Sequence, residues 1–191
     1  MLASGVCLYR FSDNMTFCLT TTADLEVPGR IQDAPGYTGQ PVYKRGAATL
    51  ILSGTNTFAG RFTVVEGTVE LASDTALPPS APITLKNCSV TCGAGTTNTT
   101  GVLTLSGNTT IALGEGAALA FADSSGETWA DGATLTVTGT EPLPTRALRF
   151  GTDGTGLGEA QLKRIRYNGS KVSLTAEGYL GEPKGMKIVI R

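Results

Sequence analysis

The stretch that decides the fold is residues 44–71, KRGAATLILSGTNTFAGRFTVVEGTVEL. It contains three short β-prone segments: residues 49–52, 62–65 and 68–71. Glycines stand between them, where the chain must turn without a Cβ in the way: Gly54, Gly60 and Gly67. Leu50 and Leu52 fall on one face of the first segment. Val69 and Leu71 do the same in the last, and this period of two predicts strands buried on one side.

The same stretch follows a longer pattern of fixed spacing, K-x-G-x-G-x-L-x-L-S-G-x-N-x-[YF]-x-G-x-T-x-V-x-x-G-x-L-x-L. The residues that fit it are Lys44, Gly46, Leu50, Leu52, Ser53, Gly54, Asn56, Phe58, Gly60, Val64, Gly67, Val69 and Leu71. In this pattern the chain resembles the passenger-associated repeat of bacterial autotransporters. Ala48 and Phe62 depart from it, where the family has a glycine and a threonine. The resemblance implies coils of a right-handed parallel β-helix, and it implies a fold without implying an activity.

Composition favours the same fold class. The chain has 191 residues, enough for one domain with a core, and its 25 glycines and 29 threonines favour short strands and tight turns. An apolar content of 40% argues against disorder. The chain has 15 basic and 16 acidic residues, and this balance gives no electrostatic field that would steer nucleic acid to it. We therefore predict an all-β protein, a right-handed parallel β-helix (solenoid) with a short C-terminal helix and hairpin as its cap.

The N-terminal residues show no export or membrane signal. No apolar run approaches the ~18 residues that span a bilayer, so we expect no membrane insertion by this segment. Residues 1–14, MLASGVCLYRFSDN, lack the basic and apolar regions of a signal peptide. They are typical of the middle of a coil, and we expect the chain to be the C-terminal portion of a longer protein.

The cysteines number four and form no dense disulfide framework. Cys88 and Cys92 lie roughly 13 Å apart if the strand rises ~3.3 Å per residue, which is too far for a disulfide. Cys7 and Cys18 could meet on neighbouring strands, or all four thiols could be buried as small apolar groups. Without histidine or a C-x-x-C pair, a zinc site is not expected.

The coils are expected to fill residues 1–145. Residues 29–43 should make turns with a short strand near Ile31. A partial second copy covers residues 101–121, in which LTLSGN at residues 103–108 echoes the LILSG of the repeat. Such repeated segments predict stacked coils that bury their apolar faces against each other.

Two asparagines are candidates for the corners between coils. Asn56 is expected to satisfy buried backbone groups there. Asn108 follows a matching Ser-Gly pair and could occupy the equivalent corner.

Residues 146–191 are expected to form a capping module. Residues 149–180 resemble the C-terminal end module that follows such repeats in secreted bacterial proteins. The residues that carry the resemblance are Arg149, Phe150, Gly151, Leu157, Gln161, Leu162, Ile165, Gly169, Leu174, Gly178, Tyr179 and Leu180. We predict a helix over residues 159–164, a hairpin of residues 165–167 and 172–174, and a last strand at residues 186–190. A helix and a hairpin would cover the open end of the solenoid.

The sequence contains few candidate catalytic residues. With no histidine, Ser-His-Asp and Cys-His systems are excluded on this chain. A carbohydrate-active β-helix would need grouped carboxylates, and the candidates are Glu66, Glu70, Asp123, Glu127 and Asp131. Solvated surface carboxylates explain these better, because Glu66 begins a turn and Glu70 alternates outward.

Three further features have a structural and a functional interpretation. Residues 152–156 could be a calcium turn, but they lack the downstream acidic ligand and a plain turn is favoured. Trp129 could stack on a sugar, although covering a coil edge is the favoured role. The basic group of Lys163, Arg164, Arg166 and Lys171 is interpreted as a solvated helix face. We assign no catalytic, cofactor-binding or metal-binding residue.

The leading hypothesis is a non-enzymatic solenoid stalk, a passenger segment of a secreted or surface-displayed bacterial autotransporter-like protein that could also be adhesive. The resemblance implies an extracellular or cell-surface, outer-membrane-associated location. Its partners would be upstream coils of the same polypeptide and host or matrix glycans, with no nucleic acid and no cofactor. The alternatives are a polysaccharide lyase or hydrolase of the β-helix type and a glycan-binding module with exposed aromatic residues.

Overall fold

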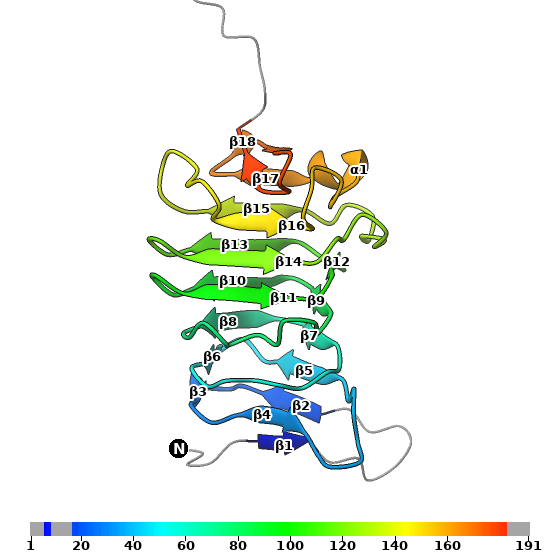
Figure 1. Cartoon of the computed structure of the whole chain (residues 1–191). Coiled ribbons are helices and arrows are strands. Elements are labelled where there is room, and N and C mark those ends of the chain that lie inside the picture. Colours follow the sequence, from blue (N-terminus) through cyan, green and yellow to red (C-terminus); the bar gives the residue numbers. More distant parts are fainter. Residues whose placement is uncertain (1–5, 9–16, 183–191) are drawn as a thin grey trace, which may run out of the picture.

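The computed structural model describes residues 6–8 and 17–182, and the strand expected at residues 186–190 lies outside this range. The chain winds through coils that stack along one axis (Figure 1). Over these described residues the fold is an all-β solenoid of about five parallel turns with one short helix. The predicted parallel β-helix is therefore confirmed.

Three sheets run along the solenoid, and each coil adds strands to them. The first sheet contains β2 (Phe17–Thr20), β5 (Val42–Arg45), β7 (Phe62–Val64), β9 (Ile83–Leu85) and β12 (Leu103–Leu105). The second contains β3 (Leu25–Val27), β6 (Thr49–Leu52), β8 (Gly67–Leu71), β10 (Cys88–Cys92), β13 (Thr109–Leu113), β15 (Leu135–Thr138), β17 (Ile165–Tyr167) and β18 (Ser170–Lys171). The third contains β11 (Thr97–Thr100), β14 (Ala118–Phe121) and β16 (Leu148–Phe150).

Smaller elements lie at the two ends. β1 (Val6–Leu8) pairs in parallel with β4 (Ile31–Asp33), the strand expected near Ile31. At the other end, the α1 helix (Glu159–Leu162) precedes β17, and β19 (Ser173–Leu174) pairs antiparallel with β20 (Leu180–Gly181). Apart from this pair and the β17–β18 hairpin, the described strands pair in parallel.

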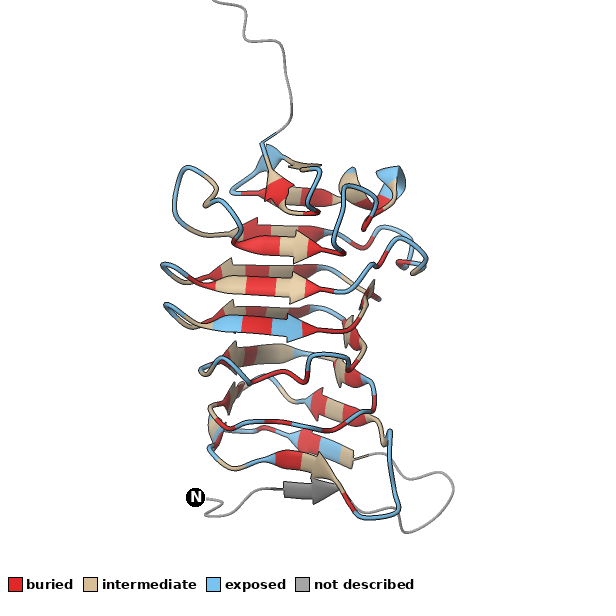
Figure 2. Ribbon diagram, in the orientation of Figure 1, coloured by how far each residue is buried: buried red, intermediate tan, exposed pale blue. Residues whose placement is uncertain are grey.

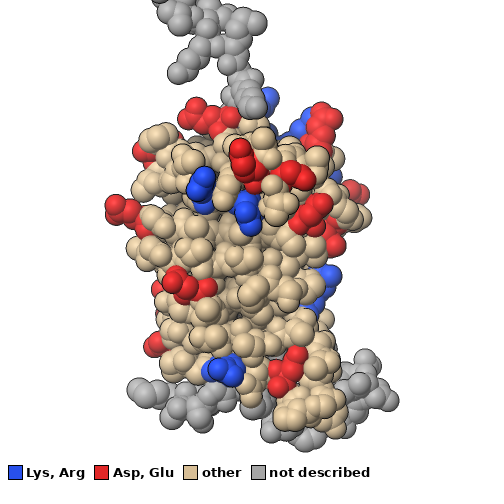
Figure 3. Space-filling view, in the orientation of Figure 1, with Lys and Arg blue, Asp and Glu red and all other residues tan. Residues whose placement is uncertain are grey.

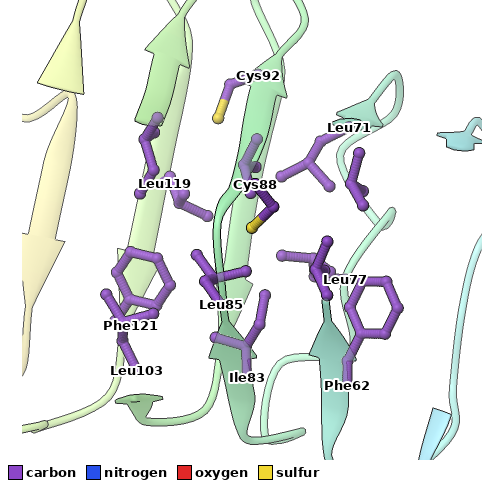
Figure 4. Close-up of a cluster of buried hydrophobic side chains, with 14 of the residues drawn as sticks. Phe62, Leu71, Leu77, Ile83, Leu85, Cys88, Cys92, Leu103, Leu119 and Phe121 are labelled. Carbon is purple, nitrogen blue, oxygen red and sulfur yellow. The ribbon is translucent and has the colours of Figure 1, made fainter. Parts of the chain in front are cut away.

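One hydrophobic column fills the interior. Register places Leu50 beside Val69, which is followed by Val90 and Ile111 along the second sheet. Buried and half-buried residues alternate along the strands (Figure 2). Side chains from all three sheets point toward each other, among them Leu85, Cys92 and Leu119 (Figure 4). The strands are thus held by side chains that each gain about 1.5–3 kcal/mol from burial.

This column agrees with the prediction from alternation. Leu50, Leu71, Leu103 and Leu119 all belong to the same buried cluster. The segments of the repeat also become strands close to their predicted bounds, as β6, β7 and β8.

The partial copy at residues 101–121 is in a different register from the repeat. Leu50 and Leu52 lie in the second sheet, whereas Leu103 and Leu105 lie in the first. The likeness of residues 103–108 to the repeat does not give the register. Strands on every side of the solenoid show the same alternation, so local sequence does not say which side a strand joins.

The C-terminal elements are shorter than expected. The helix ends at Leu162 instead of residue 164. The hairpin turn at Asn168 and Gly169 is observed, with positive φ at both residues, but β18 begins directly after it. Residues 173–174 instead form β19 and pair with β20.

The cysteines differ in environment. Cys88 and Cys92 are buried, free thiols in the same strand, as the small-apolar interpretation predicts. Cys18 is exposed, so that interpretation is wrong for it, because its position in β2 faces outward. Cys7 lies in β1 beside β4 whereas Cys18 lies in β2 beside β5, so the two are not on paired strands.

Alkaline pH should weaken the fold through Cys92. Burial raises the pKa of its thiol from 9.0 to about 12. Between these values the unfolded chain releases a proton that the native chain retains, so stability falls as pH rises. We expect urea titrations to show a loss of about 2.5 kcal/mol from this group between pH 8 and pH 11. Cys92→Ala should flatten this dependence and Cys18→Ser should leave it; a slope unchanged by Cys92→Ala would contradict the account.

Candidate functional site: a stacked coil and its cap

A buried lysine organises the corner between the first and second sheets. Lys44 lies in β5 with its side chain in the core, and register places it between Leu19 and Val64. Its ammonium donates to the carbonyl oxygens of three residues: Gly46, Ala48 at 2.6 Å and Glu66 at 3.0 Å. Burial lowers the pKa of Lys44, and the negative charge of Glu66 opposes that shift. The ammonium thus satisfies carbonyls from two consecutive coils.

Two glycines allow close approaches at this corner, and one of them, Gly67, makes room for the lysine. Gly46 and Gly67 both have positive φ, which glycine adopts without strain. A Cβ at Gly67 would lie 2.3 Å from the Lys44 Nζ and 2.3 Å from the Gly46 carbonyl oxygen. The Glu66 carboxylate also accepts from the Gly46 amide at 2.9 Å. The spacing of the lysine and Gly67 therefore has a physical cause. The Lys44 side chain of one coil occupies the space in which a side chain at position 67 of the next coil would lie.

Asparagines bridge coils on the third side, where the coils that contain β5–β6 and β7–β8 lack a strand. Asn56 is buried; its Oδ1 accepts from the Ile31 amide, and its Nδ2 donates to the Ala76 carbonyl, both at 2.8 Å. It therefore links the coils before and after its own, as predicted. The buried counterpart is Asn98, which accepts from Leu77 and donates to Ser73.

Asn108 does not occupy the corner that the sequence suggested. It is exposed directly before β13 of the second sheet, where its Oδ1 accepts from Thr134. Its amide donates to the Asn87 side chain of the previous coil. It follows the same Ser-Gly pair as the repeat, but the shifted register puts that pair at a different corner.

A buried glutamine helps to join the capped end to the last coil. Gln161 of α1 is buried, and its Nε2 donates to the Ser124 and Glu127 carbonyls at 2.9 and 3.0 Å. Its Oε1 accepts from the Gly158 amide at 2.7 Å, which replaces the missing side-chain cap of the helix. A single side chain thus begins the helix and fastens it to the coil below.

Trp129 covers the edge of the last complete coil. It is buried, and its Nε1 donates to the Leu103 carbonyl at 3.2 Å. The predicted structural role is therefore confirmed, and sugar stacking on an exposed Trp129 is wrong because the ring is inside the protein.

Residues 42–71 match the family model of the Passenger-associated-transport-repeat. The chain contains a passenger-associated transport repeat. The match covers β5 to β8, the strands that hold the Lys44 corner and Asn56. Comparison with curated proteins and with solved structures found no match.

The transport repeat carries carboxylates, but they serve structure or face solvent. Glu66 is exposed and accepts from Gly46, while Glu70 is half-buried on the outer face of β8. Over residues 17–182, no group of three or more acidic or cysteine side chains is arranged to hold a metal ion. In the same range no helix is long and apolar enough to cross a membrane.

Beyond the repeat, the remaining candidates also have local structural roles. Asp153 accepts from the Thr155 amide and hydroxyl, which makes residues 152–156 a plain turn. In the basic group, Lys163 pairs with Glu159 at 2.7 Å on the surface. Arg164 donates to the Ala130 carbonyl and so fastens the cap to the preceding coil. Arg166 donates to the Lys163 and Ile165 carbonyls within the cap, so neither arginine is only part of a solvated face.

Replacing Asn56 tests the bridge between coils in the transport repeat. Asn56→Ala leaves the Ile31 amide and the Ala76 carbonyl buried without a partner, and we expect a loss of about 2 kcal/mol in the free energy of unfolding. Asn108→Ala is the matched control on the surface and should cost about 0.5 kcal/mol. Urea unfolding of both variants checks this, and equal losses would show that the bridge adds nothing.

Proposed function

We propose that this chain is a structural stalk, a passenger segment of a secreted or surface-displayed bacterial autotransporter-like protein. The transport repeat and the solenoid support this, because both serve to extend a rigid axis. Residues 1–145 would be the coils and residues 146–191 the capping module. The carrying observation is that Lys44, Asn56 and Asn98 all bind backbone of neighbouring coils, so their chemistry is used for stacking.

We further propose that upstream coils of the same polypeptide continue the stack beyond β1, and that the exterior makes adhesive contacts. Hydroxyls support a contact role: Thr68, Ser89, Thr110 and Thr136 follow each other in register on the outer face of the second sheet. The chain would act without catalysis, and any enzyme activity would belong to other segments.

A coil insertion tests the stalk. Cys88 and Thr109 occupy equivalent positions in neighbouring coils, so residues 88–108 form one full turn. A second copy of this turn, inserted before Thr109, should lengthen the particle by about 4.8 Å at constant cross-section in small-angle X-ray scattering. A folded variant of unchanged length would contradict the proposal.

Surface display needs its own test. Antibodies raised against the folded chain should bind intact bacteria that produce it. Binding that appears only after lysis would overturn the proposed location and leave the stalk geometry standing.

A further inference from the structure

A depression of about 300 Å³ lies on the third side of the solenoid, close to the cap. It is formed at the ends of β11, β14 and β16, and its polar lining consists of Thr99, Thr100, Asp123, Arg149, Thr152 and Asp153. On the face that carries these strands, charged side chains of both signs gather toward the capped end (Figure 3). The depression thus combines a cation, carboxylates and hydroxyls.

Arg149 occupies the centre of a row that runs along the axis. β16 directs Leu148 and Phe150 inward and Arg149 outward. Backbone register then defines the row: Thr99, Ala120, Arg149 and Tyr179. Three strand spacings of about 4.8 Å make this row roughly 14 Å long. The small Ala120 leaves space above the sheet between the hydroxyl and the guanidinium.

The guanidinium lacks an anionic partner among the residues that the structure describes. Its Nε is buried and has no hydrogen-bond acceptor there. Its contact is the Tyr179 ring, whose centroid lies 5.6 Å from the Arg149 Cζ. Because the Arg149 side chain lines the depression, a ligand bound there could supply the acceptor that the described residues do not.

In each of the two carboxylates of the depression, one oxygen already accepts hydrogen bonds. Asp123 Oδ1 accepts from the Ser125 amide, and Asp153 Oδ1 accepts from the Thr155 amide and hydroxyl. No ion pair joins either carboxylate to Arg149 in the described part of the chain. Their negative charge disfavours a ligand that brings only anionic groups, and their remaining oxygens favour one that also brings hydroxyls.

We infer that this depression binds a uronate unit of an acidic polysaccharide. The sugar carboxylate would accept from the Arg149 fork, which suits planar carboxylates. The sugar hydroxyls would donate to Asp123 and Asp153, which line the same depression. This inference goes beyond the stalk function, which would stand without it.

Titration with trigalacturonate tests the site. We expect the Arg149 Nε–H resonance to shift in ¹H–¹⁵N spectra with a Kd on the order of 1 mM. Arg149→Gln should weaken binding at least tenfold. Arg61→Gln is the matched control, since Arg61 lies next to the first sheet with its guanidinium on the Thr84 and Thr104 hydroxyls. Thermal melting verifies that both variants are folded.

Two further ligands decide the chemistry. Neutral galactotriose lacks the carboxylate, and tricarballylate lacks the hydroxyls; both should bind at least tenfold more weakly than trigalacturonate. If galactotriose bound as tightly as trigalacturonate, Arg149 would have no role in recognition. If tricarballylate did so, the site would recognise only negative charge, and the inferred sugar specificity would be wrong. No shift of the Arg149 resonance with trigalacturonate, or an equal loss in Arg61→Gln, would overturn the inference.

Discussion

Gly67→Ala is expected to lower the free energy of unfolding by at least about 3 kcal/mol, because it fails in two ways at once. The substituted alanine would have to adopt φ +75°, which costs about 1 kcal/mol. It would also lie 2.3 Å from the Lys44 Nζ and from the Gly46 carbonyl oxygen, so the corner between two coils must open. Urea titration measures the loss.

Gly95→Ala separates the two causes. Gly95 has φ +72°, but a Cβ there would meet no atom within 4 Å. It should therefore lose only the backbone contribution of about 1 kcal/mol. If both variants lost the same amount, the fit of Lys44 against Gly67 would have no energetic weight.

Lys44→Met is expected to cost about 3 kcal/mol. Methionine keeps most of the apolar stem in the core, but the carbonyls of Gly46, Ala48 and Glu66 lose their donor. Lys86→Met is the control, because Lys86 is exposed directly after β9 of the same sheet and should change stability by less than about 0.5 kcal/mol. If Lys44→Met left the free energy of unfolding unchanged, the buried ammonium would not be what stabilises this corner.

The same variant has a pH signature. Because burial lowers the pKa of Lys44 below 10.5, the native chain releases this proton at lower pH than the unfolded chain does. Wild-type stability from this group therefore rises with pH between the lowered pKa and 10.5. The stability difference between wild type and Lys44→Met should widen over that interval, and a difference that narrows would contradict the sign.

The sequence predicted the strands well and the corners less well. Alternation of apolar residues identified β6 and β8, because a side chain buried on one side of a strand leaves a period of two. Alternation could not say which sheet a strand joins, which is why residues 101–121 were placed out of register. That choice depends on the length of each turn, which varies between coils.

The sequence predicts only part of the polar interior: Asn56 is expected there, but Lys44 and Asn98 are not. Lys44 follows Val42 by two residues, so the same alternation already puts it on the inner face, but a lysine is rarely buried unless it is paired. Asn98 was overlooked because it lies in a threonine-rich run with no resemblance to the repeat. The sequence marks Arg149 only as a residue of the end module, since a buried Nε without an acceptor is visible only in the folded chain.

The central claim is that successive coils stack in parallel register along one axis, and distances between spin labels test it most directly. Glu26, Ile51, Glu70, Thr91, Ala112 and Thr138 follow each other on the outer face of the second sheet. With Cys7 and Cys18 replaced by serine, labels at Glu26 and Thr138 should lie about 24 Å apart, five strand spacings. Labels at Glu26 and Thr91 should lie about 14 Å apart. Distances that do not grow by one spacing per coil would contradict the solenoid and the stalk function proposed from it.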